Sequence, residues 1–234
     1  MSVRLDVLAD PAAACAEMIV ATAQAGGHIV LTGGGTPRTA YEQAASSRDA
    51  WRSATLWFGD ERCVAPDDEL SNYKLANDAL FERLGDARPT VHRMRGELGP
   101  EAGADDYERQ LLDSGQPRFD LLLLGLGPDA HIASLFPDQP TLSERSRLVV
   151  GVKQAAHEPF VPRISLTLKA LAWAQSIVFL VSGESKADAV AAAFGPEANP
   201  DPHVPASLLP SLADEVTVLL DEAAASRIPG GETP

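Results

Sequence analysis

The sequence predicts one α/β domain spanning residues 1–234, built on a single doubly wound, mostly parallel sheet with helices on both faces. Three observations support this α/β/α sandwich. Short apolar runs alternate along the chain with segments of helical periodicity. This pattern is typical of parallel strands joined by crossover helices. The strongest apolar runs are hydrophobic throughout, as in strands buried on both faces. The chain shows no internal repeat and no domain linker.

The first half of the chain begins with a helix signal. Asp10 followed by Pro11 reads as an N-cap with proline at the first helical position, and the Gly26-Gly27 pair ends that helix. Apolar runs and helical spacing then predict a strand at 28–32, a helix through Tyr41 and Ala45, a strand at 55–58, a helix at 72–84 and a polar helix at 101–112.

The second half contains the most apolar strand of the chain, at 119–124. Strand-like segments at 147–152 and 163–168 flank a proline-rich loop. The remaining expected elements are a buried strand at 176–182, a helix through Val190, a proline-dense surface loop at 195–210, a last strand at 215–220 and a short alanine-rich helix.

Composition excludes several classes of partner. The hydrophobic fraction of 45% and the charged fraction of 22% are ordinary for a globular protein. The formal net charge of -14 disfavours nucleic acid and anionic membrane, because both need a cationic surface. The same excess repels anionic substrates at long range, so any phosphate site must be a local cluster of cations.

Cysteine count and hydropathy bear on the location of the protein. Cys15 and Cys63 are too few and too far apart for a disulfide framework or a thiolate metal site. The first ten residues lack the apolar region of a secretory leader, and no run approaches the roughly 20 apolar residues that span a bilayer. We therefore expect a cytoplasmic protein that does not engage membranes.

A glycine-rich loop follows the first central strand. Three consecutive glycines, Gly33, Gly34 and Gly35, precede Thr36 at the start of a helix. Glycines let backbone N–H groups approach an anion, and a helix N-terminus attracts negative charge, so the loop favours phosphate binding. A tight turn without a ligand is the alternative. The loop lacks the lysine of a Walker motif.

A charged segment follows the second central strand. Asp60, Glu61 and Arg62 offer two carboxylates and a guanidinium for acid–base work or anion binding. A solvated loop whose charges pair with one another explains the segment equally well. The nearby Ser71-Asn72 pair is interpreted only as a helix cap.

The strand at 119–124 leads into a segment that contains a histidine. Its glycines formally match the G-x-G-x-x-G/A pattern of Rossmann-like dinucleotide sites. We reject that interpretation because Pro137 leaves room for only about two helical turns and Lys153 stands where an acidic ribose ligand is wanted. What remains is Asp129 and His131 on flexible backbone. Imidazole can take a proton from water near neutral pH, and a carboxylate can orient it.

Two more cations lie near other predicted strands. Lys186 occupies the first turn of a helix, where a cation opposes the helix dipole unless an anion is bound. Arg163 opens a strand, a place where arginines are often only surface residues. Together with Arg62, these cations would attract a phosphate that the net charge repels.

These residues resemble the 6-phosphogluconolactonases of the glucosamine-6-phosphate isomerase/6-phosphogluconolactonase family. The resemblance runs from Gly33 to about Asp221 and depends on ordered motifs: 33–37, 60–62 with 71–73, 125–137, and Arg163 followed by 183–186. Deaminases of similar fold typically continue toward Phe-Asn-Glu-Pro after the histidine, whereas this chain continues Ala133-Ser-Leu-Phe-Pro137. The family usually has glycine where this chain has Ala130, which costs stability if the position needs a positive φ.

The resemblance implies hydrolysis of 6-phospho-D-glucono-1,5-lactone to 6-phosphogluconate, a step of the oxidative pentose phosphate pathway, without a metal or organic cofactor. His131 is then the expected base and Asp129 its orienting partner. The expected substrate-binding residues are Gly34, Gly35, Thr36, Asp60, Arg62, Arg163 and Lys186. Two alternatives stay open: a glucosamine-6-phosphate deaminase, and a sugar-phosphate-binding regulator without catalysis. We expect a monomer or a weak homo-oligomer.

Overall fold

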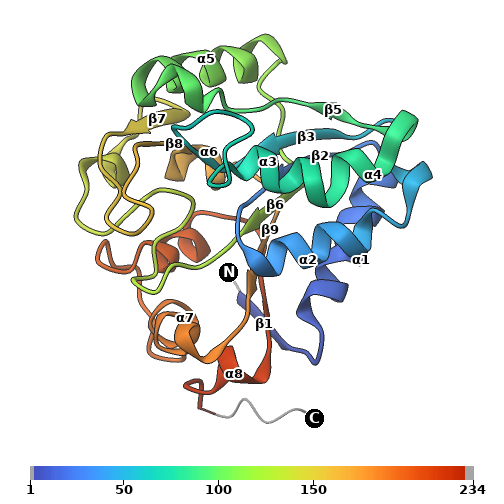
Figure 1. Ribbon diagram of the computed structural model, residues 1–234. Coiled ribbons are helices and arrows are strands. Elements are labelled where there is room, and N and C mark those ends of the chain that lie inside the picture. The colour runs from blue at the N-terminus through green and yellow to red at the C-terminus, as the bar shows by residue number, and fades with distance from the viewer. Residues whose placement is uncertain (1–2, 230–234) are drawn as a thin grey trace.

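The computed structural model describes residues 3–229 and has a seven-stranded sheet at its centre (Figure 1). Its strands lie in the order β1-β10-β9-β6-β2-β3-β5, and every neighbouring pair is parallel. The sheet confirms the predicted fold class. The strands span β1 Val3–Val7, β2 His28–Leu31, β3 Thr55–Phe58, β5 Thr90–Val91, β6 Leu121–Leu124, β9 Ser176–Val181 and β10 Val216–Leu220.

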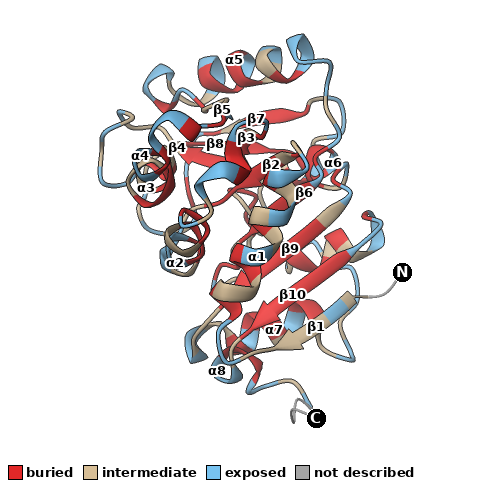
Figure 2. Ribbon diagram, turned by 90° about the vertical axis from the view of Figure 1, so that its right-hand side faces the viewer, coloured by how far each residue is buried: buried red, intermediate tan, exposed pale blue. Residues whose placement is uncertain are grey.

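The helices cover both faces of this sheet (Figures 1 and 2). The helices α1, α2, α3 and α4 lie on one face, and α5, α6 and α7 lie toward the other, while α8 follows the last strand. Their bounds are α1 Pro11–Gln24, α2 Gly35–Ala44, α3 Asn72–Ala76, α4 Glu82–Leu84, α5 Pro100–Asp113, α6 Leu168–Leu171, α7 Ala187–Phe194 and α8 Glu222–Ala225. A π-helical turn, Asn77–Phe81, joins α3 to α4, and short 3-10 turns connect several other elements.

A second, three-stranded sheet was not predicted. It consists of β4 Asp60–Arg62, β8 Arg163–Leu166 and β7 Val149–Val152, paired antiparallel in the order β4-β8-β7. The expected strands at 147–152 and 163–168 are therefore present, but they pair with each other and with β4 outside the large sheet. The N–H of Leu166 donates to the carbonyl of Gly59, which fastens the small sheet to the end of β3.

The core lies between the large sheet and its helices (Figure 2). All four leucines of β6 are buried, and β9 and β10 are buried along nearly their whole length. This explains the uniform hydrophobicity of these strands, since helices cover both of their faces. Burial of so much apolar side chain is the main stabilising contribution to the fold.

The local signals for α1 are confirmed. Asp10 is the N-cap, and its side chain accepts a hydrogen bond of 2.9 Å from the N–H of Ala13. Pro11 stands at the first helical position, where its missing N–H costs nothing. The helix ends before Gly26, whose φ of 74° is a conformation that glycine adopts without strain.

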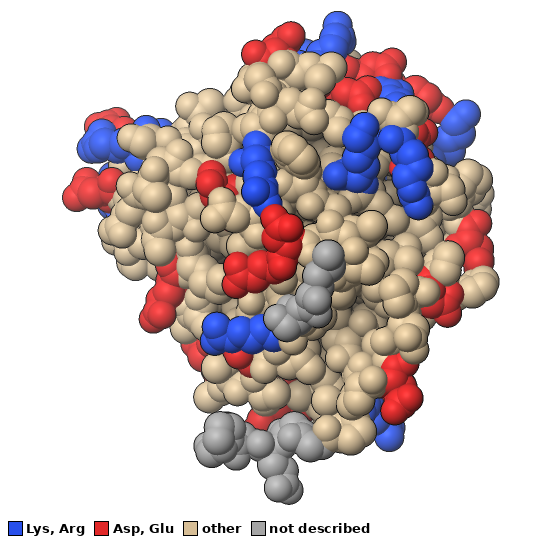
Figure 3. Space-filling view, turned by 180° about the vertical axis from the view of Figure 1, so that it is seen from behind, with Lys and Arg blue, Asp and Glu red and all other residues tan. Residues whose placement is uncertain are grey.

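The surface carries both signs of charge despite the acidic excess. On the face opposite to that of Figure 1, uncharged side chains form most of the surface, and the charged side chains there are of both signs (Figure 3). No helix within residues 3–229 combines the length and the apolar character that a membrane span requires.

Candidate functional site

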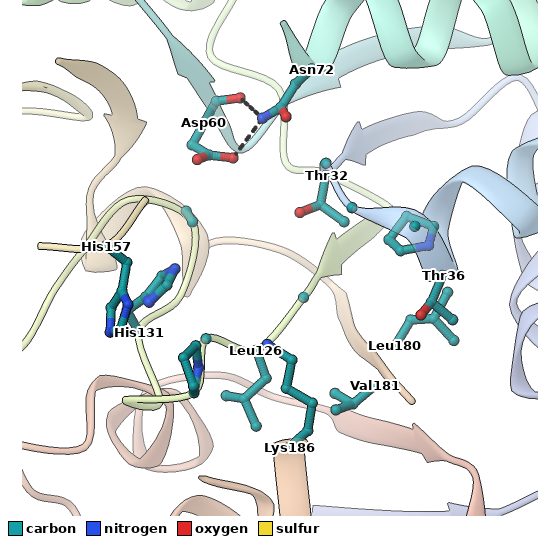
Figure 4. Close-up of a pocket in the computed structure, with 18 of the residues that line it drawn as sticks. Thr32, Thr36, Asp60, Asn72, Leu126, His131, His157, Leu180, Val181 and Lys186 are labelled. Carbon is teal, nitrogen blue, oxygen red and sulfur yellow. Dashed lines mark hydrogen bonds between the residues drawn. The ribbon is translucent and has the colours of Figure 1, made fainter. Parts of the chain in front are cut away.

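A cavity of about 420 Å³ opens at the carboxyl ends of the central strands (Figure 4). It lies where the chain changes direction in the sheet: β2 leads toward β3 on one side, and its neighbour β6 leads toward β9 on the other. In doubly wound sheets ligands bind at this switch point, because the loops that leave the two strands diverge there. The glycine loop after β2 and the segment from Gly125 after β6 both line the cavity.

His131 and Asp129 form a bonded pair at one side of the cavity. The imidazole Nδ1 lies 2.5 Å from Asp129 Oδ1, and the backbone N–H of His131 donates to the same oxygen at 3.2 Å. Burial raises the pKa of the Asp129 carboxyl, but the hydrogen bonds and charge of His131 outweigh it and lower that pKa below its ordinary value. Asp129 is therefore an acceptor, and the proton between the two side chains belongs to Nδ1.

The assignment of that proton defines the chemistry of the other ring nitrogen. With Nδ1 protonated, the Nε2 of a neutral His131 carries a lone pair. No side chain or backbone group of the described residues hydrogen-bonds Nε2, and His131 lines the cavity with 18% of its side chain exposed. The arrangement presents a base to whatever small molecule fills the cavity.

A tight turn brings the histidine back over its own loop. The N–H of Gly127 donates to the carbonyl of His131, and a Cβ added to Gly127 would lie 2.0 Å from the His131 Nδ1. Glycine at 127 therefore allows the ring of His131 to lie where it does. Ala130 has a φ of 60°, so this position does adopt the left-handed conformation that disfavours alanine, at a cost of about 1 kcal/mol.

Asp60 is buried at another wall of the cavity and is held from three directions. Asn72 Nδ2 donates to Asp60 Oδ1 at 3.0 Å, and Ser134 Oγ donates to Oδ2 at 2.7 Å. The guanidinium of Arg163 lies 4.0 Å from Oδ2. The interpretation of this segment as a solvated loop is wrong, since Asp60 belongs to β4 and is only 5% exposed.

Glu61 has a structural role at the start of α3. Its carboxylate accepts hydrogen bonds from the N–H groups of Arg62, Asn72 and Tyr73 and from Ser71 Oγ. Burial is the largest influence on this carboxyl and raises its pKa, while the backbone N–H donors oppose that change. Ser71 is the N-cap of α3, as expected. Four donors occupy Glu61, so it is not available to a ligand.

Arg163 is a buried residue rather than a surface one. It is 4% exposed and donates to the carbonyls of Pro159 and Val161 at 2.8 and 3.3 Å. Burial lowers its pKa, and the charge of Asp60 opposes that effect. Arg62 also lines the cavity, and its Nη1 donates to the carbonyl of Leu70 at 2.6 Å.

Lys186 lies across the cavity floor from Asp60 (Figure 4). It is the N-cap of α7, and none of the carboxylates in residues 3–229 forms an ion pair with it. Burial lowers its pKa, and the charge of Asp129 opposes that shift. A half-buried, unpaired cation at a helix N-terminus is unfavourable without an anion.

The glycine loop supplies backbone donors to the same cavity. Gly35 begins α2, so its N–H and that of Thr36 have no partner within the helix. A Cβ added to Gly35 would meet no atom within 4 Å, whereas one added to Gly33 would lie 2.0 Å from Asn72 Oδ1. A methyl group at Gly33 would thus displace the Asn72 amide, whereas Gly35 leaves open space beside the cavity.

The structure brings the candidate residues from distant segments together. His131 and the seven expected substrate-binding residues line one cavity, and Asp129 lies directly behind His131. Sequence reasoning missed several side chains of that cavity, among them Asn72 and His157. Asn72 had been interpreted only as part of a helix cap, and His157 stands in a proline-rich loop with no motif that would mark it.

Fold and cavity define an α/β protein with a polar small-molecule pocket at the switch point of a doubly wound sheet. The chain belongs to the glucosamine-6-phosphate isomerase/6-phosphogluconolactonase family, whose sequence model matches residues 4–219. Proteins named 6-phosphogluconolactonase from Synechocystis and Mycobacterium leprae are 37% and 40% identical over 210 and 215 residues, 86% of this chain and 85% of each relative. The solved structure of a Trypanosoma brucei 6-phosphogluconolactonase has a TM-score of 0.81 at 27% identity, covering 96% of this chain and 98% of that one.

Proposed function

We propose that this protein hydrolyses 6-phospho-D-glucono-1,5-lactone to 6-phosphogluconate. The observation that carries the proposal is the pairing of Asp129 with Nδ1 of His131, which leaves Nε2 without a partner among the described residues, beside a cavity lined by cations. Membership of the family and relatives named 6-phosphogluconolactonase support the choice of substrate.

In the proposed reaction His131 takes a proton from water, and the oxygen of that water attacks the C1 carbonyl of the lactone. The tetrahedral intermediate then expels the ring oxygen, which receives the proton from His131. Asp129 stabilises the imidazolium formed between these steps, because the carboxylate lies 2.5 Å from Nδ1. The lactone is an activated ester, so positioning and one base suffice.

The opposite side of the cavity suits a phosphate. Figure 4 shows Thr36 across the cavity from His131, with Lys186 between them at the lower edge. Lys186 and the free N–H groups at the start of α2 would bind the phosphate, with Arg62 and Arg163 contributing positive charge from the wall near Asp60. Asp60 would accept hydrogen bonds from sugar hydroxyls.

Two assays of the purified protein test the proposal. Lactone opening is followed in a weakly buffered pH-indicator assay and corrected for spontaneous opening. Ammonia release from glucosamine 6-phosphate is measured at the same enzyme concentration. We expect rapid lactone hydrolysis and no ammonia above background. Ammonia release without lactone hydrolysis would identify a deaminase, and no turnover of either compound would favour a binding protein without catalysis.

Two further expectations remain predictions. Light scattering after size-exclusion chromatography tests whether the protein is a monomer or a weak homo-oligomer. Fractionation of cells that produce the protein tests the expected cytoplasmic location.

A further inference from the structure

Asp129 is shared by two histidines. Its Oδ1 binds His131, and its Oδ2 lies 3.3 Å from Nε2 of His157. The two imidazole rings are 5.8 Å apart at an interplanar angle of 28°, and both histidines line the cavity (Figure 4). His157 therefore contacts the Asp129–His131 pair, although the proposed mechanism gives it no role.

The loop that carries His157 is fastened to the site. His157 lies between β7 and β8, and the carbonyl of Pro159, two residues on, accepts a hydrogen bond of 2.8 Å from Arg163. Val161 also accepts from Arg163, and the N–H of Val161 donates to the Pro159 carbonyl. These contacts fasten the backbone just after His157 to a buried residue of the same cavity.

We propose that His157 is a positioning residue for the base: the contact of its Nε2 with Asp129 Oδ2, at 3.3 Å, restricts rotation of the carboxylate. This inference rests on the proposed function. A carboxylate held only through Oδ1 can rotate about its Cβ–Cγ bond. With Oδ2 also in contact with His157, Oδ1 stays directed at the Nδ1–H of His131, which keeps Nε2 of His131 toward the cavity.

The solvent exposure of His131, Asp129 and His157 increases in the order in which the proposal links them. The exposed fraction rises from 18% for His131 to 24% for Asp129 and 42% for His157, so His157 is the most solvent-exposed member of the cluster. In the described part of the chain, no three His, Cys, Asp or Glu side chains are placed to hold one metal ion.

Replacement of His157 by alanine and by glutamine tests the proposal. His157→Ala should lower kcat for the lactone about tenfold, comparable to the effect of outer-shell groups that orient metal-binding histidines, with KM changed less than twofold. Glutamine can place its Nε2–H where the histidine Nε2–H lies, so His157→Gln should recover most of the lost kcat. The matched control is Phe160→Ala, since Phe160 lies in the same loop, is 67% exposed and does not line the cavity.

A double-variant cycle separates action through Asp129 from a general effect on the loop. If His157 acts by holding the carboxylate, the His157→Ala change should have little further effect on kcat in an Asp129→Asn protein. An unchanged kcat in His157→Ala, no recovery in His157→Gln, or equal losses in both backgrounds would overturn the proposal. A wild-type protein that does not hydrolyse the lactone would instead overturn the proposed function.

Discussion

Gly127 shows how a single missing side chain positions the proposed base. A methyl group at this residue would lie 2.0 Å from Nδ1 and 2.3 Å from Cε1 of His131. The ring would have to move, and the hydrogen bond to Asp129 would move with it. Gly127→Ala is therefore expected to lower kcat by about 100-fold, since a displacement of about 1 Å in a catalytic group has an effect of that size. Steady-state kinetics with the lactone measure it.

Gly59→Ala provides the control for that experiment. A Cβ on Gly59 meets its nearest atoms, in Leu31 and Val30, at 3.6 Å, which is an ordinary contact. This variant should fold and turn over like the wild type. Equal kcat in Gly127→Ala and Gly59→Ala would mean that the position of the His131 ring does not limit the reaction.

Residues in local motifs could be predicted from the sequence, and residues placed by tertiary contacts could not. Asp129 and His131 are two residues apart after a strongly apolar strand, so their proximity is a local property. His157 reaches Asp129 only because the loop between β7 and β8 folds back over the cavity. The burial of Arg163 likewise depends on that loop, whose carbonyls receive its N–H groups.

At the scale of elements, Asp106 attaches α5 to the preceding turn. Its carboxylate accepts from Arg95 Nε at 2.8 Å and from Gln110 at 2.9 Å, and Arg95 also makes a second, shorter contact. Burial raises the pKa of this carboxyl, but the bonds from Arg95 and Gln110 outweigh it and lower the pKa below its ordinary value. The charged form of Asp106 thus stabilises the folded state.

Asp106→Asn is expected to lower the free energy of unfolding at pH 7 by about 1.5 kcal/mol. This value is at the low end for a hydrogen bond to a charged group, because Arg95 is half-exposed and solvent weakens the interaction. A carboxyl with a depressed folded pKa contributes its stability above its unfolded pKa and loses it as the pH falls through the folded pKa. The difference between wild type and variant should therefore shrink in urea titrations performed below about pH 4. Asp113→Asn, at an exposed residue of the same helix, is the control. A difference that stays constant with pH would contradict the assignment.

The elements that the sequence predicted are those whose own residues specify them. The strands β6, β9 and β10 are apolar throughout, and α1 has its own cap. Strand β4 consists of Asp60, Glu61 and Arg62, residues of poor strand propensity, and it forms because β8 pairs with it. Strand β5 has two residues, too few for any periodicity. Strand β1 alternates apolar and polar residues as an edge strand does, so its own residues carry a local strand signal.

At the scale of the molecule, the net charge of -14 contrasts with the cations of the cavity. Lys186 is unfavourably placed in the free protein, being half-buried at the N-terminus of α7. Lys186→Met should therefore leave the melting temperature unchanged or higher, while raising KM for the lactone about tenfold through the loss of a charge-assisted contact to phosphate. Thermal unfolding and steady-state kinetics measure the two effects.

Lys169→Met is the matched control for the change of charge. Lys169 is exposed on α6 and does not line the cavity. Lys169→Met changes the net charge of the protein by the same amount as Lys186→Met. It should therefore leave KM unchanged if the effect of Lys186 is local. Equal changes of KM in the two variants would point to long-range electrostatics instead.

The measurement that tests the central claim most directly is lactone hydrolysis by the wild type and by His131→Ala, each corrected for spontaneous opening. The wild type should accelerate the reaction strongly. His131→Ala should lose about 100-fold or more of that acceleration, as expected for removal of a general base, while its melting temperature stays near that of the wild type. A folded His131→Ala protein with near-normal turnover would contradict the claim that this histidine is the base.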